Sequence, residues 1–188
     1  MKYINKVREY FKNTSVASIG SISRLVGNKN YTYTLLNHLL KKGDINRIKK
    51  GYYTVHEDPS LIVYCLKPAY LGLQDAMSFH NIWEQETCPV VITTRKVRTG
   101  IRKVFDSNVL VKRISPKYFF GYDFYKYGDF VFPVSDMEKT FIDLVYFREI
   151  GDEFVMKFKK KMNIKKINLY LEKYPENFRR KVLDMLRD

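Results

Sequence analysis

The sequence predicts an α+β protein in which a small, mainly helical N-terminal unit precedes a larger domain of mixed strands and helices. Two observations support this prediction. Apolar residues recur at helical spacing up to residue 42 and are followed, up to residue 55, by a basic strand–turn–strand pattern. After Asp58 and Pro59, runs of β-branched and aromatic residues alternate with helical periodicity. We therefore expect one domain at residues 1–58 and a second at residues 59–188, with C-terminal helices at 164–187.

The composition is that of a folded chain without a membrane segment. Of the 188 residues, 45% are hydrophobic and 15% are aromatic, which is enough for a real core. No apolar run reaches the roughly 18 residues that a membrane-spanning helix needs, and charges occupy the N-terminus where a signal peptide needs an apolar stretch. Cys65 and Cys88 are isolated and are not at metal-ligand spacing to His38, His56 or His80. We therefore expect a cytoplasmic protein with no membrane association, no metal and no cofactor.

Positive charge gathers at the two ends of the chain. The sequence has 34 basic and 20 acidic residues, a net charge of +14. Residues 1–60 carry 11 Lys or Arg and 4 Asp or Glu, residues 61–147 carry 11 and 9, and residues 148–188 carry 12 and 7. A basic N-terminal end is typical of a module that binds a polyanion, because each neutralised phosphate releases counterions. The alternative is that surface lysines are simply solvated, above all at the C-terminal end.

The first sixty residues begin with two predicted helices. Ile4, Val7 and Phe11 form one apolar stripe of a first helix. Ser18 is a suitable N-cap for a second helix, which ends at a turn that Gly27 permits. The inward residues of this second helix are Ile19, Ile22, Leu25 and Val26.

A third helix, from about residue 30 to 42, has one apolar and one polar face. Its apolar face consists of Leu35, Leu36, Leu39 and Leu40. The opposite face holds Asn30, Thr34, Asn37 and Lys41, with Tyr31 and His38 flanking it. Asparagine pairs with adenine, threonine contacts the thymine methyl group, and tyrosine and lysine reach phosphates. This face therefore has the composition of a recognition helix for the major groove of DNA.

A basic hairpin follows the third helix. Ile45 and Ile48 are expected to point inward, Gly51 supplies the turn, and the residues expected to contact DNA are Arg47, Lys49, Lys50 and Tyr52. The order helix, turn, helix and basic wing is typical of a winged helix-turn-helix domain, which predicts double-stranded DNA as the partner. The main alternative use of such a domain is contact with another protein.

The second domain is expected to be a mixed or antiparallel sheet with helices. Strands are predicted at 61–66, 90–94, 109–114, 118–125 and 129–134, and a helix at 73–83. Ser135 and Glu138 have the spacing of a capping box at the start of a further helix. Near the C-terminus, one apolar stripe consists of Ile164, Ile167, Leu171 and Tyr174, and Pro175 begins a last helix.

Four segments of the chain resemble the AbiEi family of antitoxins, the regulatory half of type IV toxin–antitoxin (abortive-infection) operons. They are the helix-turn-helix that ends in KKGYY at 49–53, YLGLQDAMSFH at 70–80, VVITTRK at 90–96 and VSDMEKTFIDL at 134–144. The chain departs from the family at Lys139, where arginine is usual, and the C-terminal helices match no family pattern.

The resemblance implies a transcriptional repressor in an antiviral defence system. Such a protein binds inverted repeats in its own promoter through the winged helix. Its second domain is linked to neutralising a nucleotidyltransferase-like toxin, without a stable complex between the two proteins. A stand-alone regulator with the same two domains and no toxin partner is the alternative.

The sequence also offers two other readings of the second domain. One segment of this domain is rich in basic residues, namely Arg95, Lys96, Arg98, Arg102 and Lys103. It is either a contact for DNA, RNA or an acidic partner, or an ordinary charged loop between two strands.

A metal-dependent nuclease would need two or three carboxylates and a lysine around Mg²⁺. The candidates are Asp75, Glu84, Glu86, Asp123, Asp129, Asp136, Glu138 and Lys139. A cluster of Asp75, Asp136 or Asp143 with Lys139 in one cleft would favour the nuclease. No phosphate loop or hydrolase motif is present, so we expect no enzyme.

Overall fold

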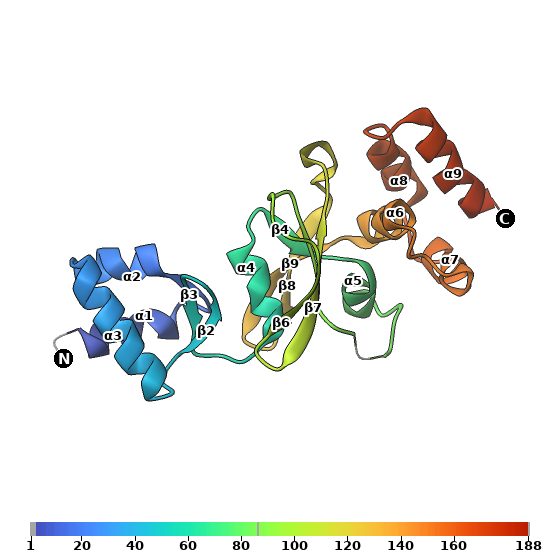
Figure 1. Ribbon diagram of the computed structural model, residues 1–188. Coiled ribbons are helices and arrows are strands. Elements are labelled where there is room, and N and C mark those ends of the chain that lie inside the picture. The colour runs from blue at the N-terminus through green and yellow to red at the C-terminus, as the bar shows by residue number, and fades with distance from the viewer. Residues whose placement is uncertain (1–2, 86, 188) are drawn as a thin grey trace.

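The computed structural model describes residues 3–85 and 87–187, and it is a mixed α+β structure with a mixed sheet. Figure 1 shows three parts in a row. A helical N-terminal unit lies at one end, a six-stranded sheet lies in the middle, and the C-terminal helices lie at the other end. Within the described residues, no helix has the length and apolar character needed to cross a membrane.

The N-terminal unit packs three helices against a small antiparallel sheet. Its elements are α1 (Ile4–Lys12), β1 (Ala17–Ser18), α2 (Ile19–Val26), α3 (Lys29–Lys41), β2 (Asn46–Lys49) and β3 (Tyr52–Thr54). The strand order is β1-β3-β2. The core consists of the apolar stripes that the sequence predicts, including Val7, Phe11, Ile22 and Leu35, and it also contains Tyr53.

The second domain is built on a sheet with the strand order β6-β7-β5-β4-β9-β8. The strands are β4 (Ala69–Leu71), β5 (Val90–Thr93), β6 (Gly100–Val104), β7 (Ser107–Arg113), β8 (Tyr122–Tyr127) and β9 (Phe130–Ser135). The pairs β5–β7 and β4–β9 are parallel, and the other neighbours are antiparallel. The sheet is therefore mixed, which was one of the two predicted arrangements.

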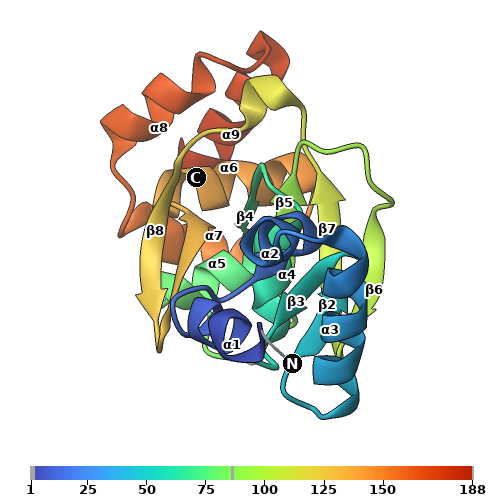
Figure 2. The same ribbon diagram turned by 90° about the vertical axis from the view of Figure 1, so that its left-hand side faces the viewer.

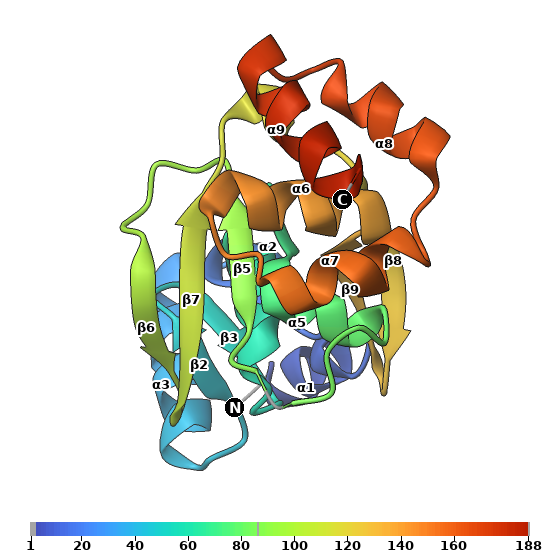
Figure 3. The same cartoon turned by 90° about the vertical axis from the view of Figure 1, so that its right-hand side faces the viewer.

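Helices cover both faces of this sheet (Figures 1 and 3). One face packs against α4 (Ile62–Cys65) and the short helix η1 (Pro59–Leu61), through a core that includes Leu66, Val91 and Phe132. The other face packs against α5 (Leu73–Phe79) and α6 (Met137–Phe147). The C-terminal helices α7 (Asp152–Lys159), α8 (Ile164–Leu171) and α9 (Glu176–Arg187) extend this second core.

The β2–β3 hairpin also belongs to the second domain's core. Ile48 of β2 is buried in the same apolar cluster as Leu61 and Leu66, and Tyr52 of β3 packs against that cluster. The other expected inward residue, Ile45, lies in the N-terminal core. The hairpin is thus held between the two domains.

The strand predicted at 61–66 is wrong, because this segment is helical. Asp58 accepts a hydrogen bond from the backbone N–H of Ser60 at 2.8 Å, and Pro59 occupies the first helical position. Both features start a helix. A short apolar run that is buried all round has no periodicity to distinguish the two structures.

Other boundaries shift for identifiable reasons. Strands β4 and β6 were not predicted, and α5 ends at Phe79 rather than at residue 83. The predicted strand at 118–125 begins at Tyr122, after a short 3-10 helix, η2 (Pro116–Tyr118). The predicted capping box at Ser135 is also wrong. Asp136 caps α6 by accepting a hydrogen bond from the backbone N–H of Lys139 at 2.8 Å.

The C-terminal helices follow their predicted stripes except at one position. Ile167, Leu171 and Tyr174 are buried, whereas Ile164 is 56% exposed. Ile164 is the first residue of α8, where Asn163 caps the helix and the apolar side chain has no neighbouring layer to cover it. Four lysines lie within residues 157–161, a segment that spans the end of α7 and the turn after it.

Candidate nucleic-acid interface

The turn between α2 and α3 is fixed by caps at both ends. Ser18 accepts a hydrogen bond from the N–H of Ser21 at 3.0 Å, so α2 starts where the sequence predicts. Gly27 ends α2 with φ +78°, a conformation that costs glycine little. Asn28 then caps α3 by accepting a hydrogen bond from Tyr31 N–H at 2.9 Å. Helix α3 therefore has a defined direction relative to α2.

The polar face of α3 is free of protein contacts that would bury it. Asn30, Thr34, Asn37 and Lys41 are all exposed. Thr34 donates a hydrogen bond to the carbonyl of Asn30 at 3.4 Å. The amide of Asn37 and the ammonium of Lys41 make no hydrogen bond to another described residue, which leaves them available to a ligand.

Tyr31 and His38 flank this face and are half-buried. The ring of Tyr31 packs edge-on against Tyr3, with 5.8 Å between the ring centroids. This contact fixes the Tyr31 ring against α1 and leaves only part of the side chain open to solvent.

Three further residues belong to the exposed surface around α2 and α3. Arg24 and Lys29 are exposed, and Tyr33 is 47% exposed. All three line a shallow cleft between the two helices. Tyr33 precedes Asn37 by four positions and Lys41 by eight, so helical spacing places these three in one stripe. That spacing was the signal that sequence reasoning missed.

The predicted wing residues differ in exposure. Arg47 and Lys50 are exposed, whereas Lys49 and Tyr52 are half-buried. A bulge separates Arg47 from Lys49 in the β2–β3 pairing. Gly51, with φ +81°, closes the turn, and its carbonyl accepts a hydrogen bond from the N–H of Ile19 at 2.8 Å. The hairpin tip is therefore attached to the start of α2. The side chain of Tyr52 is partly buried because it packs against the core of the second domain.

The basic residues of the hairpin and of the second domain lie close together. The positive charges of Arg95 and Arg102 act on Lys49, and burial together with these charges lowers the pKa of Lys49. Arg95 also donates a hydrogen bond to the carbonyl of Cys65 at 3.3 Å, at the C-terminal end of α4. In both Figure 2 and Figure 3, α3 and β6 lie toward the same edge of the molecule. Lys49 of the hairpin therefore lies near two arginines of the second domain.

The remaining basic residues of the segment lie on both a loop and a strand. Arg95, Lys96 and Arg98 precede β6 and are exposed. Arg102 and Lys103 lie on β6 itself, where Arg102 is half-buried and Lys103 is exposed. The sequence reading of this segment as a loop between two strands therefore missed an edge strand that carries two of its charges.

The carboxylates considered for a nuclease do not gather around Lys139 in a cleft. Lys139 and Asp143 form an ion pair in which both side chains are fully buried. Asp136 accepts a hydrogen bond from Tyr170 at 2.6 Å, and Glu138 accepts one from the backbone N–H of Asn163 at 2.8 Å. Lys166 also forms ion pairs with Asp136 and Glu138 at 3.1 Å, so these contacts hold α8 on α6.

Among the described residues, none of the other candidate carboxylates forms an ion pair with Lys139. Asp75 lies on α5, Glu84 follows α5, and Asp123 and Asp129 are exposed on the β8–β9 hairpin. Glu86 lies outside the described residues. Within residues 3–85 and 87–187, no three His, Cys, Asp or Glu side chains are grouped so that they could hold a metal ion.

Comparisons with known proteins bear on the fold alone. No protein-family model and no curated protein matches the chain. Among solved structures, the chain is similar to the crystal structure of the RV2827C protein from Mycobacterium tuberculosis. The TM-score is 0.65 at 10% sequence identity, over 100% of this chain and 77% of that chain. The two proteins share an α+β architecture across the full length of this chain.

Proposed function

We propose that this protein is a sequence-specific DNA-binding transcriptional regulator whose N-terminal unit works as a winged helix-turn-helix. The observation that carries the proposal is the exposed polar face of α3, at Asn30, Thr34, Asn37 and Lys41, next to a basic hairpin. Short polar side chains on a helix suit direct contact with base edges in the major groove. No residue of the chain is proposed to be catalytic.

The DNA contact is proposed to extend beyond the N-terminal unit. Arg95 and Arg102 lie close enough to Lys49 to act on its charge. Cations held together in this way repel one another, and a polyanion relieves that repulsion when it binds. In this arrangement α3 contacts the bases, while Arg47, Lys50 and the basic residues before and on β6 contact the phosphate backbone.

A binding titration tests this proposal. The purified protein is titrated against its own upstream DNA and against a scrambled duplex of equal length, at two salt concentrations. Tighter binding to the upstream DNA, with a steep dependence on salt, supports a regulator that acts on its own promoter. Equal and weak binding to both duplexes would instead favour a winged helix used for protein contact.

For the second domain we propose the antitoxin role that the four AbiEi-like segments suggest. The partner would be a nucleotidyltransferase-like toxin encoded beside this chain. The support for this proposal is that resemblance, and the test is genetic. Expression of an adjacent toxin gene should arrest growth, and co-expression of this chain should restore it. Lack of rescue, together with specific promoter binding, would identify a stand-alone regulator instead.

A further inference from the structure

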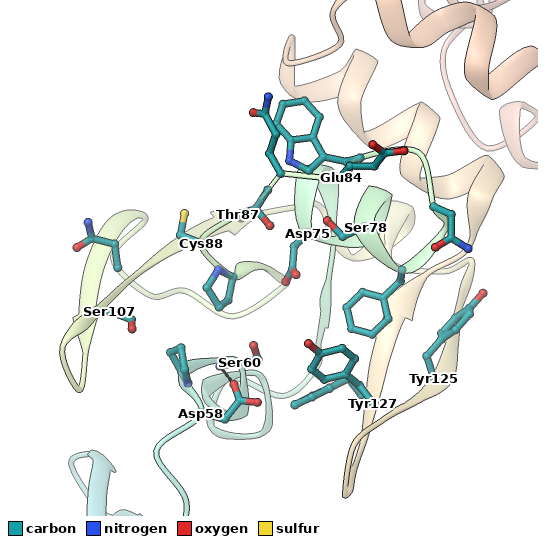
Figure 4. A pocket seen from close by; sticks show the side chains of 18 of the residues that line it. Asp58, Ser60, Asp75, Ser78, Glu84, Thr87, Cys88, Ser107, Tyr125 and Tyr127 are labelled. Carbon is teal, nitrogen blue, oxygen red and sulfur yellow. Dashed lines mark hydrogen bonds between the residues drawn. The ribbon is translucent and has the colours of Figure 1, made fainter.

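A groove lies at the junction between the linker after the hairpin, helix α5 and the β8–β9 hairpin (Figure 4). Its volume is about 940 Å³, at the upper end of the roughly 300–1,000 Å³ typical of small-molecule sites. Figure 4 shows side chains from all three parts facing the groove: Asp58, Ser60, Asp75, Ser78, Tyr125 and Tyr127. None of these residues belongs to the proposed DNA surface.

The groove is acidic, although the protein as a whole is strongly basic. Its described charged lining residues are Asp58, Asp75, Glu84 and Lys126, three carboxylates and one ammonium. None of the three carboxylates forms an ion pair with a described residue. Unpaired carboxylates that outnumber the ammonium groups of a cavity favour a positively charged ligand.

Asp58 and Asp75 are fixed in position and keep binding capacity. Asp58 accepts one hydrogen bond from Ser60 N–H at 2.8 Å, and Asp75 accepts one from Val90 N–H at 3.2 Å. In the part of the chain that the structure describes, the second oxygen of each carboxylate accepts no hydrogen bond. Burial raises the pKa of Asp75 to about 7, and the charge of Asp58 adds to this shift. The two carboxylates therefore face the same space.

Aromatic rings also line the groove, and one of them, Phe79, lies one turn after Asp75 on α5. Phe79 packs edge-on against Tyr127 with 5.7 Å between ring centroids, and against Tyr125 with 6.2 Å. Tyr127 is 64% exposed, and Trp83 also lines the groove. Aromatic faces attract organic cations through the ring quadrupole and provide contact area for a flat apolar group.

We propose that this groove binds a small organic cation with a flat ring. Its positive group lies between the carboxylates of Asp58 and Asp75, and its ring lies against Phe79 and Tyr127. A divalent metal ion fits less well, because Mg²⁺ and Ca²⁺ take about six or more oxygen ligands, and the described residues do not supply such a cluster. The groove shares no residue with the proposed DNA surface, so the proposal of cation binding and the proposal of DNA binding can be tested separately.

Trp83 makes the binding directly measurable. It is the only tryptophan in the chain, and it lines the groove. The probes are benzamidinium, its neutral analogue benzamide and its anionic analogue benzoate, which share one ring and differ in charge. We expect saturable quenching or enhancement of tryptophan fluorescence by benzamidinium, with affinity at least about tenfold higher than for the other two, because a charge-assisted hydrogen bond accounts for such a difference.

Two variants and one matched control locate the site. Asp75→Asn and Asp58→Asn keep a hydrogen-bond acceptor while removing the charge, and each should weaken benzamidinium binding roughly tenfold. Glu172→Gln removes an exposed carboxylate at the C-terminal end of α8, which does not line the groove, and should bind like the original protein. Unchanged circular dichroism and melting behaviour of the variants confirms that the fold is intact.

The pH dependence gives a second readout. The groups that face Asp75 are Asp58, Glu84, Cys88 and Lys126, together with the two tyrosines of β8. Since Asp75 loses its proton near neutral pH, benzamidinium should bind several-fold tighter at about pH 8 than at about pH 6. Asp75→Asn should remove this difference.

Three results would overturn the proposal. The first is equal binding of benzamidinium, benzamide and benzoate, and the second is equal affinity in Asp75→Asn and in the Glu172→Gln control. The third is the absence of saturable binding by benzamidinium and by a second aromatic cation, tyramine. All measurements use the full chain without DNA, so a failure here leaves the promoter-binding result unaffected.

Discussion

Lys139 and Asp143 lie one turn apart on α6 and form an ion pair that is completely buried. Burial lowers the pKa of Lys139 and raises the pKa of Asp143, while the charge of each partner opposes the shift of the other. The hydroxyl of Tyr70 donates to Asp143 at 2.7 Å, and Lys139 donates to Tyr174 at 3.3 Å. The pair therefore connects strand β4 and the segment between α8 and α9 through one helix.

Asp143→Ala should destabilise the protein by about 3–5 kcal/mol, because it leaves a buried ammonium without its partner. The double variant Lys139→Met with Asp143→Leu should be less destabilised than Asp143→Ala, because it removes both charges and keeps apolar volume. Urea unfolding measures the free energy of each variant. A double variant that is less stable than the single one would contradict this account of the pair.

Asp75→Asn should change how stability depends on pH. An ordinary aspartate has a pKa of roughly 3.9 in the unfolded chain, whereas burial raises the pKa of Asp75 in the folded protein to about 7. Between these two values the folded protein binds more protons, so its stability falls as pH rises. The variant lacks this loss and should gain about 3–4 kcal/mol relative to the original protein between about pH 4 and pH 8.

This gain is measured by urea unfolding at several pH values. The hydrogen bond from Val90 should persist in the variant, because the asparagine oxygen also accepts it. A constant difference between the two proteins across the pH range would show that Asp75 titrates as an ordinary exposed carboxyl.

Asn37→Ala and Arg102→Gln should weaken DNA binding in different ways. Asn37→Ala should cost about 1–3 kcal/mol on the promoter DNA and little on a scrambled duplex, because its amide is proposed to contact a base. Arg102→Gln should weaken binding to both duplexes equally and reduce the salt slope by about one unit. Fluorescence anisotropy titrations check both, with Lys181→Gln as an exposed control on α9. Promoter binding that Arg102→Gln leaves unchanged would restrict the interface to the N-terminal unit.

The two cysteines should differ sharply in reactivity. Cys88 is exposed, whereas Cys65 is buried on α4, where burial raises its pKa to about 12. Because the thiolate is the reactive species, a maleimide should label one thiol in the folded protein and two in urea. Mass spectrometry counts the labels, and Cys88→Ser should abolish the fast reaction. Rapid double labelling without denaturant would mean that α4 opens readily.

The helices of the N-terminal unit could be predicted well because their signals are local. Ser18 caps α2 and Gly27 ends it, as the residue types indicate. The segment from 61 to 66 was predicted wrongly because its burial on all sides is a tertiary property. The proximity of Lys49 to Arg95 could not be predicted either. The two residues are 46 positions apart in the sequence, and they are brought together only by the packing of the two domains.

The capping of α6 shows a similar limit. Ser135 and Glu138 have the spacing of a capping box, but Ser135 ends strand β9 and its hydroxyl is hydrogen-bonded to Thr140 at 2.8 Å. Asp136 takes the capping role, and Glu138 instead bonds to Asn163. Ser135 and Asp136 are both suitable N-cap residues. Because strand β9 extends through Ser135, the helix begins one residue later and Asp136 caps it. The groove at Asp75 could not be predicted either, because its lining residues come from the linker at Asp58, from α5 and from the β8–β9 hairpin, which are far apart in the sequence.

The position of Ile48 and Tyr52 in the second domain's core has an evolutionary consequence. An N-terminal unit joined only by a flexible tether is easily exchanged between proteins by recombination. Here the hairpin supplies one wall of its neighbour's interior, so a replacement module would have to bring matching apolar residues at these two positions. We expect the two halves of this protein to be inherited together, and chimaeras joined at the linker to fold only when that wall is restored.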